Sequence, residues 1–170
     1  MALYRAHVLV CRGTGCTASG SGPLYETFKE ELARRGLDKE VMLVETGCHG
    51  MCEMGPIVVV YPEGSFYCRV KPEDVPELVE EHLYKGRILQ RLLYTTPDVE
   101  KIKIPHYRDI PFYGKQRRIV LRNCGYINPD NIEEYIARDG YQALAKVLLE
   151  LPAEETLDIV KKFGLRGGGG

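Results

Sequence analysis

Four cysteines in two short pairs are the feature that most constrains the fold of this chain. Cys11 and Cys16 lie in VLVCRGTGCTASG with four residues between them, and Cys48 and Cys52 lie in ETGCHGMCEMGP with three. Each pair follows a short apolar run and is interleaved with glycine. Grouped cysteines of this kind are typical of metal-binding or redox sites. Because 31 residues separate the pairs, the fold has to bring two distant loops together before four sulfurs can share one site.

The order of the predicted elements supplies such a fold. A helix follows the first of four apolar strands and another follows the fourth, which gives the order β-α-β-β-β-α of a thioredoxin-like α/β arrangement. A right-handed crossover makes the first two strands parallel and places their C-terminal ends at one edge of the sheet. Both cysteine loops leave from that edge, so the four sulfurs can meet. The predicted strands span residues 5–10, 41–45, 57–61 and 66–70.

Capping residues and helical periodicity define the two helices. Pro23 suits a first-turn position and Gly36 a C-terminal stop, while Asp74 and Glu77 have capping-box spacing. The segment between Cys11 and Pro23 is so rich in Gly, Ser and Thr that we expect an irregular loop. The residues expected to face the core are Leu24, Phe28 and Leu32 on the first helix, and Val75, Leu78, Val79, His82 and Leu83 on the second.

The cysteine spacing suits either a [2Fe–2S] cluster or a tetrahedral zinc ion. Iron is favoured because the neighbouring glycines leave room for the backbone to approach inorganic sulfide and donate N–H bonds to it. Three interpretations stay open at this point: an iron–sulfur electron-transfer site, a zinc-stabilised interaction module without a redox role, and redox-active or structural thiols. The glycines concerned are Gly13, Gly15, Gly47, Gly50 and Gly55.

Other candidate residues receive simpler interpretations. The chain has no C-x-x-C pair, which argues against a dithiol oxidoreductase. His49 follows Cys48, but no second C-x-x-H pair exists, so we expect a loop residue beside the site and not a Rieske-type ligand. Cys68 is expected to be a small buried hydrophobe, and Cys124 a packed or free thiol in a turn. We assign no catalytic residue.

Composition narrows the class of protein. No apolar stretch approaches the ~20 residues of a membrane helix, so we expect no membrane span. The net charge of −1 argues against a general nucleic-acid binder. The start MALYRAHVLV does not resemble a signal peptide. We therefore expect a cytoplasmic location, where grouped cysteines rarely form a disulfide framework.

From Tyr94 onward the character of the chain changes. Residues 94–116 are rich in Pro, Tyr and Lys and have little periodicity, so we expect a domain boundary or linker around 90–105. A short strand is predicted at residues 118–122. The basic residues around it, with Arg108, are expected to form a solvated or docking surface and not a nucleotide site.

Three short helices are predicted after that strand. Asn128 caps the first, Asp139 and Gln142 have capping-box spacing for the second, and Pro152 opens the third. The apolar residues expected to face inward are Ile132, Tyr135, Ile136, Leu144, Val147, Leu148, Leu151, Leu157, Val160 and Phe163.

Two stretches carry a family resemblance. CRGTGCTASG together with CHGMCEMGP resembles the thioredoxin-like [2Fe–2S] ferredoxin family. HYRDIPFYGKQRRIVLRNCGYINPDNIEEYIARDGYQALAKVL resembles the start of the flavoprotein subunit of NADH dehydrogenases, as found in NAD(P)-linked hydrogenases and formate dehydrogenases. The whole chain therefore resembles the N-terminal part of that subunit in its ferredoxin-fused form.

The resemblance implies that Cys11, Cys16, Cys48 and Cys52 bind a [2Fe–2S] cluster. It implies that residues 1–90 form a thioredoxin-like [2Fe–2S] ferredoxin domain, followed by a linker and a small mixed, mainly helical segment over residues 91–170. This segment corresponds to the start of the flavoprotein-like domain and is expected to end before the FMN site. Gly167–Gly170 would be the beginning of the flavin loop.

The implied function is one-electron transfer within an NAD(P)H-dependent oxidoreductase. FMN, NAD(P) and a [4Fe–4S] cluster are expected only in a longer full-length subunit, so the chain as given is not expected to be catalytic alone. The expected partners are other iron–sulfur and flavoprotein subunits of a redox complex. Free-standing relatives add a homodimer as a further expected assembly.

Overall fold

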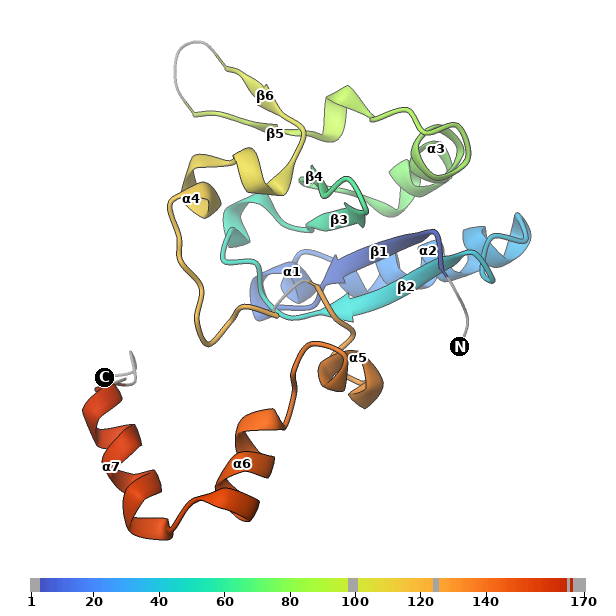
Figure 1. The fold of residues 1–170 in the computed structure, drawn as a ribbon. Coiled ribbons are helices and arrows are strands. Elements are labelled where there is room, and N and C mark those ends of the chain that lie inside the picture. The colour runs from blue at the N-terminus through green and yellow to red at the C-terminus, as the bar shows by residue number, and fades with distance from the viewer. Residues whose placement is uncertain (1–3, 98–100, 124–125, 165, 167–170) are drawn as a thin grey trace. The chain divides into compact units, whose positions relative to one another are not determined.

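The chain forms two compact units in the computed structural model (Figure 1). The first comprises residues 1–129 and the second residues 130–170. The structure describes residues 4–97, 101–123, 126–164 and 166. The predictions for Cys124 and for the terminal glycines lie outside these residues. No helix within the described ranges is long and apolar enough to cross a membrane.

A mixed four-stranded sheet in the order β2-β1-β3-β4 is the centre of the first unit. β1 and β2 are parallel, β1 and β3 antiparallel, and β3 and β4 form a hairpin. The predicted strand order and the parallel crossover are therefore confirmed. The strands are β1 (Ala6–Cys11), β2 (Val41–Thr46), β3 (Val58–Tyr61) and β4 (Ser65–Tyr67).

The register of the parallel pair determines where the cysteine loops begin. Cys11, the last residue of β1, lies opposite Thr46, the last residue of β2. The Arg12 N–H then donates to the Thr46 carbonyl oxygen at 2.8 Å, which extends the pairing by one step. Both loops consequently leave the same edge of the sheet from adjacent positions.

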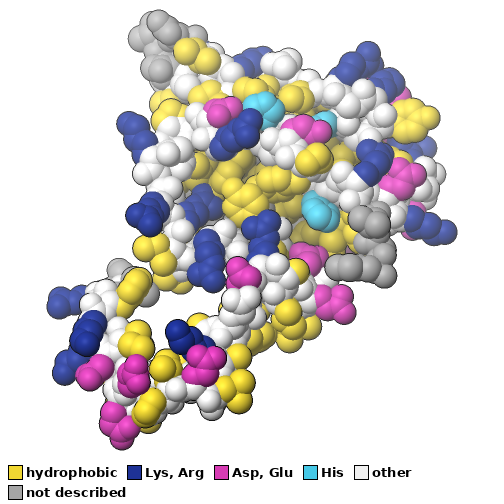
Figure 2. All heavy atoms as spheres, viewed as in Figure 1, with side chains coloured by type: hydrophobic (Ala, Val, Ile, Leu, Met, Phe, Trp, Pro, Cys, Tyr) yellow, Lys and Arg dark blue, Asp and Glu magenta, His cyan; other side chains and the backbone are white. Residues whose placement is uncertain are grey.

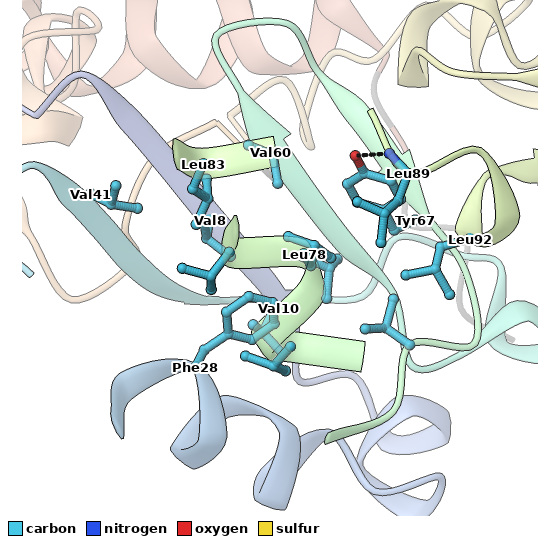
Figure 3. Packing of buried hydrophobic residues seen from close by; sticks show 14 of the residues in the cluster. Val8, Val10, Phe28, Val41, Val60, Tyr67, Leu78, Leu83, Leu89 and Leu92 are labelled. Carbon is cyan, nitrogen blue, oxygen red and sulfur yellow. Dashed lines mark hydrogen bonds between the residues drawn. The ribbon is translucent and has the colours of Figure 1, made fainter. Parts of the chain in front are cut away.

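Two helical segments cover one face of this sheet. α2 (Ser21–Arg34) runs along β1 and β2 and ends before Gly36, whose positive φ of 68° suits a C-terminal stop. α3 (Val75–Leu78) follows a 3-10 turn at Pro72–Asp74 and continues as the π-helix Val79–Tyr84. Figure 3 shows Phe28 and Leu78 lying close to Val8 and Val10 in this core. All the core-facing residues predicted for the two helices are buried.

One polar pair lies inside this core. The Tyr67 hydroxyl lies 2.8 Å from His82 Nδ1, and the Leu89 N–H donates to the same hydroxyl at 3.3 Å (Figure 3). Both rings are buried and meet edge to face. The hydrogen bonds offset the cost of burying a phenol and an imidazole, which would otherwise be about 1–3 kcal/mol for each unsatisfied group.

Lowering the pH below about 6.5 should destabilise the first unit through His82. Burial lowers the pKa of His82 from its ordinary 6.5, against the opposing effect of the Glu63 carboxylate 3.9 Å away. The unfolded chain therefore takes up this proton at a higher pH than the folded chain. The stabilising contribution of the neutral His82 ring is fully present above pH 6.5, and it is lost as the pH falls through the pKa of His82 in the folded state.

The variant His82→Gln tests this expectation, because its amide can still bond the Tyr67 hydroxyl but does not titrate. Its thermal midpoint, followed by circular dichroism, should fall less steeply with decreasing pH than that of the wild type. Equal slopes for the two proteins would contradict the assignment.

The first cysteine loop contains a helix that was not predicted. α1 (Thr14–Ala18) carries Cys16 and is followed by a left-handed Gly20. Apart from Ala18 its residues have poor helix propensity, and the expectation of an irregular loop was wrong because tertiary packing buries Cys16 and sets Gly15 against Cys52. Thr17 donates through its N–H to the Gly13 carbonyl and through its hydroxyl to the Arg12 carbonyl, which holds the turn against the sheet.

Residues beyond 90 continue the first unit. Short elements follow one another here and pack on the second face of the sheet, whose apolar residues include Leu9, Val59 and Phe66. The first compact unit therefore extends well past the boundary predicted around 90–105. The elements are a 3-10 turn at Gln90–Leu92, β5 (Tyr94–Thr95), β6 (Lys103–Ile104), a 3-10 turn at Tyr107–Asp109 and α4 (Pro111–Gly114).

The strand predicted at residues 118–122 does not form. Ile119, Val120 and Leu121 are exposed and lie in turns. The β-branched run suits a strand in composition, but β-propensity acts only where a partner strand and a packing surface exist.

The second unit is helical, as predicted. Asn131 caps the first helix by accepting a hydrogen bond from the Glu133 N–H, so the cap lies three residues after the one predicted at Asn128. The apolar residues predicted to face inward are largely exposed, among them Leu148 at 73% and Leu157 at 69%, and apolar side chains are visible along these helices in Figure 2. The helices are α5 (Ile132–Ile136), α6 (Gln142–Glu150) and α7 (Ala153–Phe163).

Candidate metal centre

The four predicted site cysteines lie at the shared edge of β1 and β2. Cys11 ends β1 and Cys16 lies in α1, and both are buried. Cys48 lies in the loop after β2 and Cys52 opens the 3-10 turn Cys52–Met54, and both are exposed. The structure thus brings together two loops that are far apart in the sequence, with one cysteine pair inside and one at the surface.

The sulfurs are arranged as two pairs. The Sγ atoms of Cys48 and Cys52 are 3.9 Å apart, and Cys11 lies close enough to Cys16 to raise the pKa of its thiol. Among the described residues, no group of three His, Cys, Asp or Glu side chains converges on a single-ion position. Two pairs of thiols correspond to a two-iron cluster in which each iron receives two cysteines.

Glycines of each loop lie against cysteines of the other. A methyl group at Gly13 would stand 2.8 Å from Cys48 Cβ, and one at Gly15 would stand 2.9 Å from Cys52 Cβ. In the reverse direction, a methyl group at Gly55 would stand 2.9 Å from Cys16 Sγ. Real Cβ atoms do not approach so closely, so these positions require glycine. The reciprocal contacts form a cradle that suits a compact cluster held by both loops.

Backbone donors also reach the sulfurs. The Gly50 N–H donates to Cys48 Sγ at 3.3 Å, and Gly50 adopts a left-handed φ of 82° that glycine tolerates best. N–H bonds to thiolate sulfur disperse negative charge and tune a cluster's potential. The donor set therefore fits an iron–sulfur group in geometry and in chemistry.

Two of the four thiols, those of Cys16 and Cys52, have raised pKa values. Burial, reinforced by the neighbouring Cys11, raises the pKa of Cys16 to about 12. The adjacent Cys48 thiol raises the pKa of Cys52. Metal binding requires thiolates and releases their protons. Bound iron would supply the positive charge that favours the thiolate forms of Cys16 and Cys52.

His49 is buried beside the site, with 6% of its surface exposed. Its ring packs edge-on against Phe66 and Tyr107, at centroid distances of 6.2 and 5.7 Å. Burial, together with the charge of Arg118, lowers the pKa of His49 to about 4, so the ring is neutral at physiological pH. Neither ring nitrogen makes a hydrogen bond to the described residues.

The remaining described cysteine is not part of the site. Cys68 lies just after β4, is 7% exposed and packs in the apolar cluster that includes Phe66 and Val59. Burial raises the pKa of Cys68 to about 12, which keeps the thiol protonated and unreactive. The prediction of a small buried hydrophobe is confirmed.

Sequence reasoning missed Tyr113, which bonds the second cysteine loop at the His49 carbonyl, and Arg118, which lies on the Tyr113 ring. Tyr113 and Arg118 lie more than 60 residues from Cys48, in a stretch without periodicity. The sequence signal for them is the density of aromatic residues in HYRDIPFY, within the stretch expected to be a boundary or linker. The bond from Tyr113 to the loop, and the position of Arg118 on Tyr113, depend on tertiary structure.

Comparison with known proteins agrees with this geometry. The model of the thioredoxin-like [2Fe–2S] ferredoxin family matches residues 3–83. A [2Fe–2S] ferredoxin from Clostridium pasteurianum is 46% identical over 96 residues, covering 51% of this chain and 92% of the relative. The crystal structure of the thioredoxin-like [2Fe–2S] ferredoxin from Aquifex aeolicus aligns with a TM-score of 0.51 and 38% identity, covering 56% of this chain and all of that one.

A further relative is much longer. Subunit HndC of the NADP-reducing hydrogenase of Solidesulfovibrio fructosivorans is 59% identical over 56 residues, which cover 33% of this chain and 11% of HndC. The similarity to the two ferredoxins, by contrast, extends over nearly their whole length. With its thioredoxin-like sheet and its paired thiols, the chain belongs to the thioredoxin-like [2Fe–2S] ferredoxin family, and its cofactor is a [2Fe–2S] cluster.

Proposed function

We propose that Cys11, Cys16, Cys48 and Cys52 hold the [2Fe–2S] cluster and that the chain carries single electrons. The observation that carries this proposal is the reciprocal contact between the glycines of each loop and the cysteines of the other. When bound, the cluster supplies one-electron redox chemistry. The residues of the chain supply the thiolates, the backbone donor at Gly50 and the close approach of the two loops.

The difference in burial among the four cysteines indicates which face of the protein exchanges electrons with a partner. Cys11 and Cys16 are buried against the sheet, at 0% and 1% exposure, whereas Cys48 and Cys52 face solvent. A redox partner can approach the exposed pair most closely. We therefore propose the loop of residues 47–55 as the face at which electrons enter or leave.

We further propose that the chain works within an NAD(P)H-linked oxidoreductase of the hydrogenase, formate dehydrogenase or NADH dehydrogenase type. The similarity to part of HndC supports this proposal, as do the motifs of the second half. Residues 1–90 would then be the ferredoxin domain, and residues 91–170 the start of a flavoprotein-like domain. FMN, NAD(P) and a [4Fe–4S] cluster would belong to a longer subunit, and the partners would be other redox subunits.

Metal and sulfide analysis of anaerobically purified protein tests the ligand assignment. We expect two iron and two sulfide per chain, visible absorption that bleaches on reduction with dithionite, and an EPR signal in the reduced state. A colourless protein containing stoichiometric zinc would instead support the zinc-stabilised module. For the larger assembly, NAD(P)H should reduce this cluster in the full-length subunit, and failure to do so with FMN bound would contradict that part of the proposal.

A further inference from the structure

The second face of the sheet is covered by a segment outside the residues that the family model matches. That model ends at residue 83, yet Tyr94, Tyr107, Ile110 and Tyr113 pack against the face formed by Leu9, Val59, Phe66 and their neighbours. Ile110 is completely buried. We call residues 104–118 the aromatic clamp.

Backbone hydrogen bonds join the start of the clamp to the open edge of β4. The Phe66 N–H donates to the Pro105 carbonyl at 2.9 Å, and the Tyr107 N–H donates to the Gly64 carbonyl at 2.8 Å. Ser65 and His106 form an antiparallel bridge between these bonds. An edge that would otherwise present unpaired backbone groups is thereby closed, and the clamp is held in a defined register on the sheet.

The other end of the clamp contacts the second cysteine loop. The Tyr113 hydroxyl donates to the His49 carbonyl oxygen at 2.6 Å, and Tyr113 is only 6% exposed. Phe112 lies next to Gly50, within 3.6 Å of where a Cβ would stand. His49 and Gly50 are the two residues that follow Cys48, so the clamp restrains the backbone between the two surface cysteines.

A guanidinium group lies on the clamp. The Arg118 Cζ atom is 5.1 Å from the ring centroids of both Tyr107 and Tyr113, which stack with their centroids 4.0 Å apart. Arg118 also donates a hydrogen bond to the Tyr107 hydroxyl. It is half-buried, whereas its neighbour Arg117 is exposed. Its positive charge is thus held on the two stacked rings, one of which bonds the His49 carbonyl, and its partial burial reduces screening by solvent.

We propose that the aromatic clamp positions the second cysteine loop and tunes the potential of the cluster, with Tyr113 as a positioning residue and Arg118 as a fixed positive charge. The inference rests on the proposed ligand set. Reduction adds negative charge to the cluster, and a nearby guanidinium stabilises the reduced state. The clamp therefore raises the reduction potential of the cluster, in addition to covering the sheet.

The proposed effect of the Arg118 charge on the reduction potential is tested by redox titration of the holoprotein, monitored by visible absorption or EPR. Arg118→Gln should shift the midpoint potential to a more negative value. Arg117→Gln removes the same charge from the adjacent, exposed position and should shift it less, and that smaller shift should vanish at high salt. Equal shifts in the two variants, or no shift in Arg118→Gln, would overturn the role of Arg118.

The positioning role of Tyr113 is tested by the rate at which the holoprotein releases iron to a chelator. Tyr113→Phe keeps the ring and removes the hydrogen bond to His49, and should release iron about fivefold faster, as expected from the loss of one hydrogen bond. Tyr84→Phe, which changes a tyrosine with 69% exposure outside the clamp, should release iron at the wild-type rate. An unchanged rate in Tyr113→Phe would overturn the positioning role.

The ligand assignment and the clamp proposal can fail separately. If the wild-type protein contains no [2Fe–2S] cluster, the proposed ligand set fails and the clamp has no cluster to tune. If the wild type contains a full cluster and the clamp variants match it in potential and in iron release, the clamp proposal alone fails.

Discussion

Replacing Cys52 with alanine is expected to abolish the [2Fe–2S] spectrum. Cys52 forms a close pair with Cys48, with 3.9 Å between their sulfurs, so its removal leaves one iron with a single protein thiolate. Cys68 is not expected to substitute: it is buried in the same apolar cluster as Cys11 and Cys16, and burial raises its pKa to about 12, which disfavours the thiolate that a ligand requires. The measurement is the iron and sulfide content of anaerobically purified Cys52→Ala, together with its visible spectrum. A full, stable [2Fe–2S] spectrum would refute the ligand assignment.

The matched control for this experiment is Cys68→Ala. This substitution also removes one thiol from the first unit. The small cavity that it leaves should lower the free energy of unfolding only modestly, because the group removed is small. The variant should retain full iron and sulfide content with a slightly lower thermal midpoint. Loss of the cluster in Cys68→Ala to the same extent as in Cys52→Ala would show that general destabilisation explains both results.

The second large effect is expected from Gly13→Ala. The added methyl group would stand 2.8 Å from Cys48 Cβ and 3.1 Å from its Sγ, so the two cysteine loops would have to separate. Overpacking of this kind costs about 1–3 kcal/mol. Because the strain falls on a proposed ligand, we expect at least about fivefold less cluster per chain after purification, measured as iron and sulfide content.

Gly22→Ala is the control for the glycine variant. Its methyl group would meet only the far end of the flexible Arg12 side chain, at 3.0 Å, and Gly22 lies inside α2. Alanine favours a helix over glycine by about 0.5–1 kcal/mol, so this variant should keep its cluster and be slightly more stable. If Gly13→Ala keeps as much cluster as Gly22→Ala, the close approach of the two loops is not needed for cluster binding.

The part of the fold that sequence reasoning predicted well is the part with strong local periodicity. Leu24, Phe28 and Leu32 repeat every four residues and all face the core. The apolar runs of β1, β2 and β3 were located to within a residue, and the handedness rule for crossovers was enough to place both cysteine loops at one edge. The cysteine spacing then pointed to the site.

The predictions that failed concern segments whose structure depends on what lies beside them. α1 forms in a run composed mostly of poor helix formers because Cys16 is buried and Gly15 packs against Cys52 of the other loop. Residues 118–122 have the composition of a strand, yet they pair with none of the strands found among the described residues. The apolar faces of α6 and α7 were expected to be inward but are exposed, since periodicity defines a face without identifying what covers it.

The cysteine pairs illustrate what local sequence determines and what tertiary packing decides. The sequence alone determined that four thiols lie in two glycine-rich loops after two parallel strands, because residue identity and strand periodicity are local properties. Only the tertiary structure decided which glycine faces which cysteine, which pair is exposed, and that Tyr113 bonds the second loop from more than 60 residues away with Arg118 on its ring. Such contacts arise from packing between distant segments, and no local pattern encodes them.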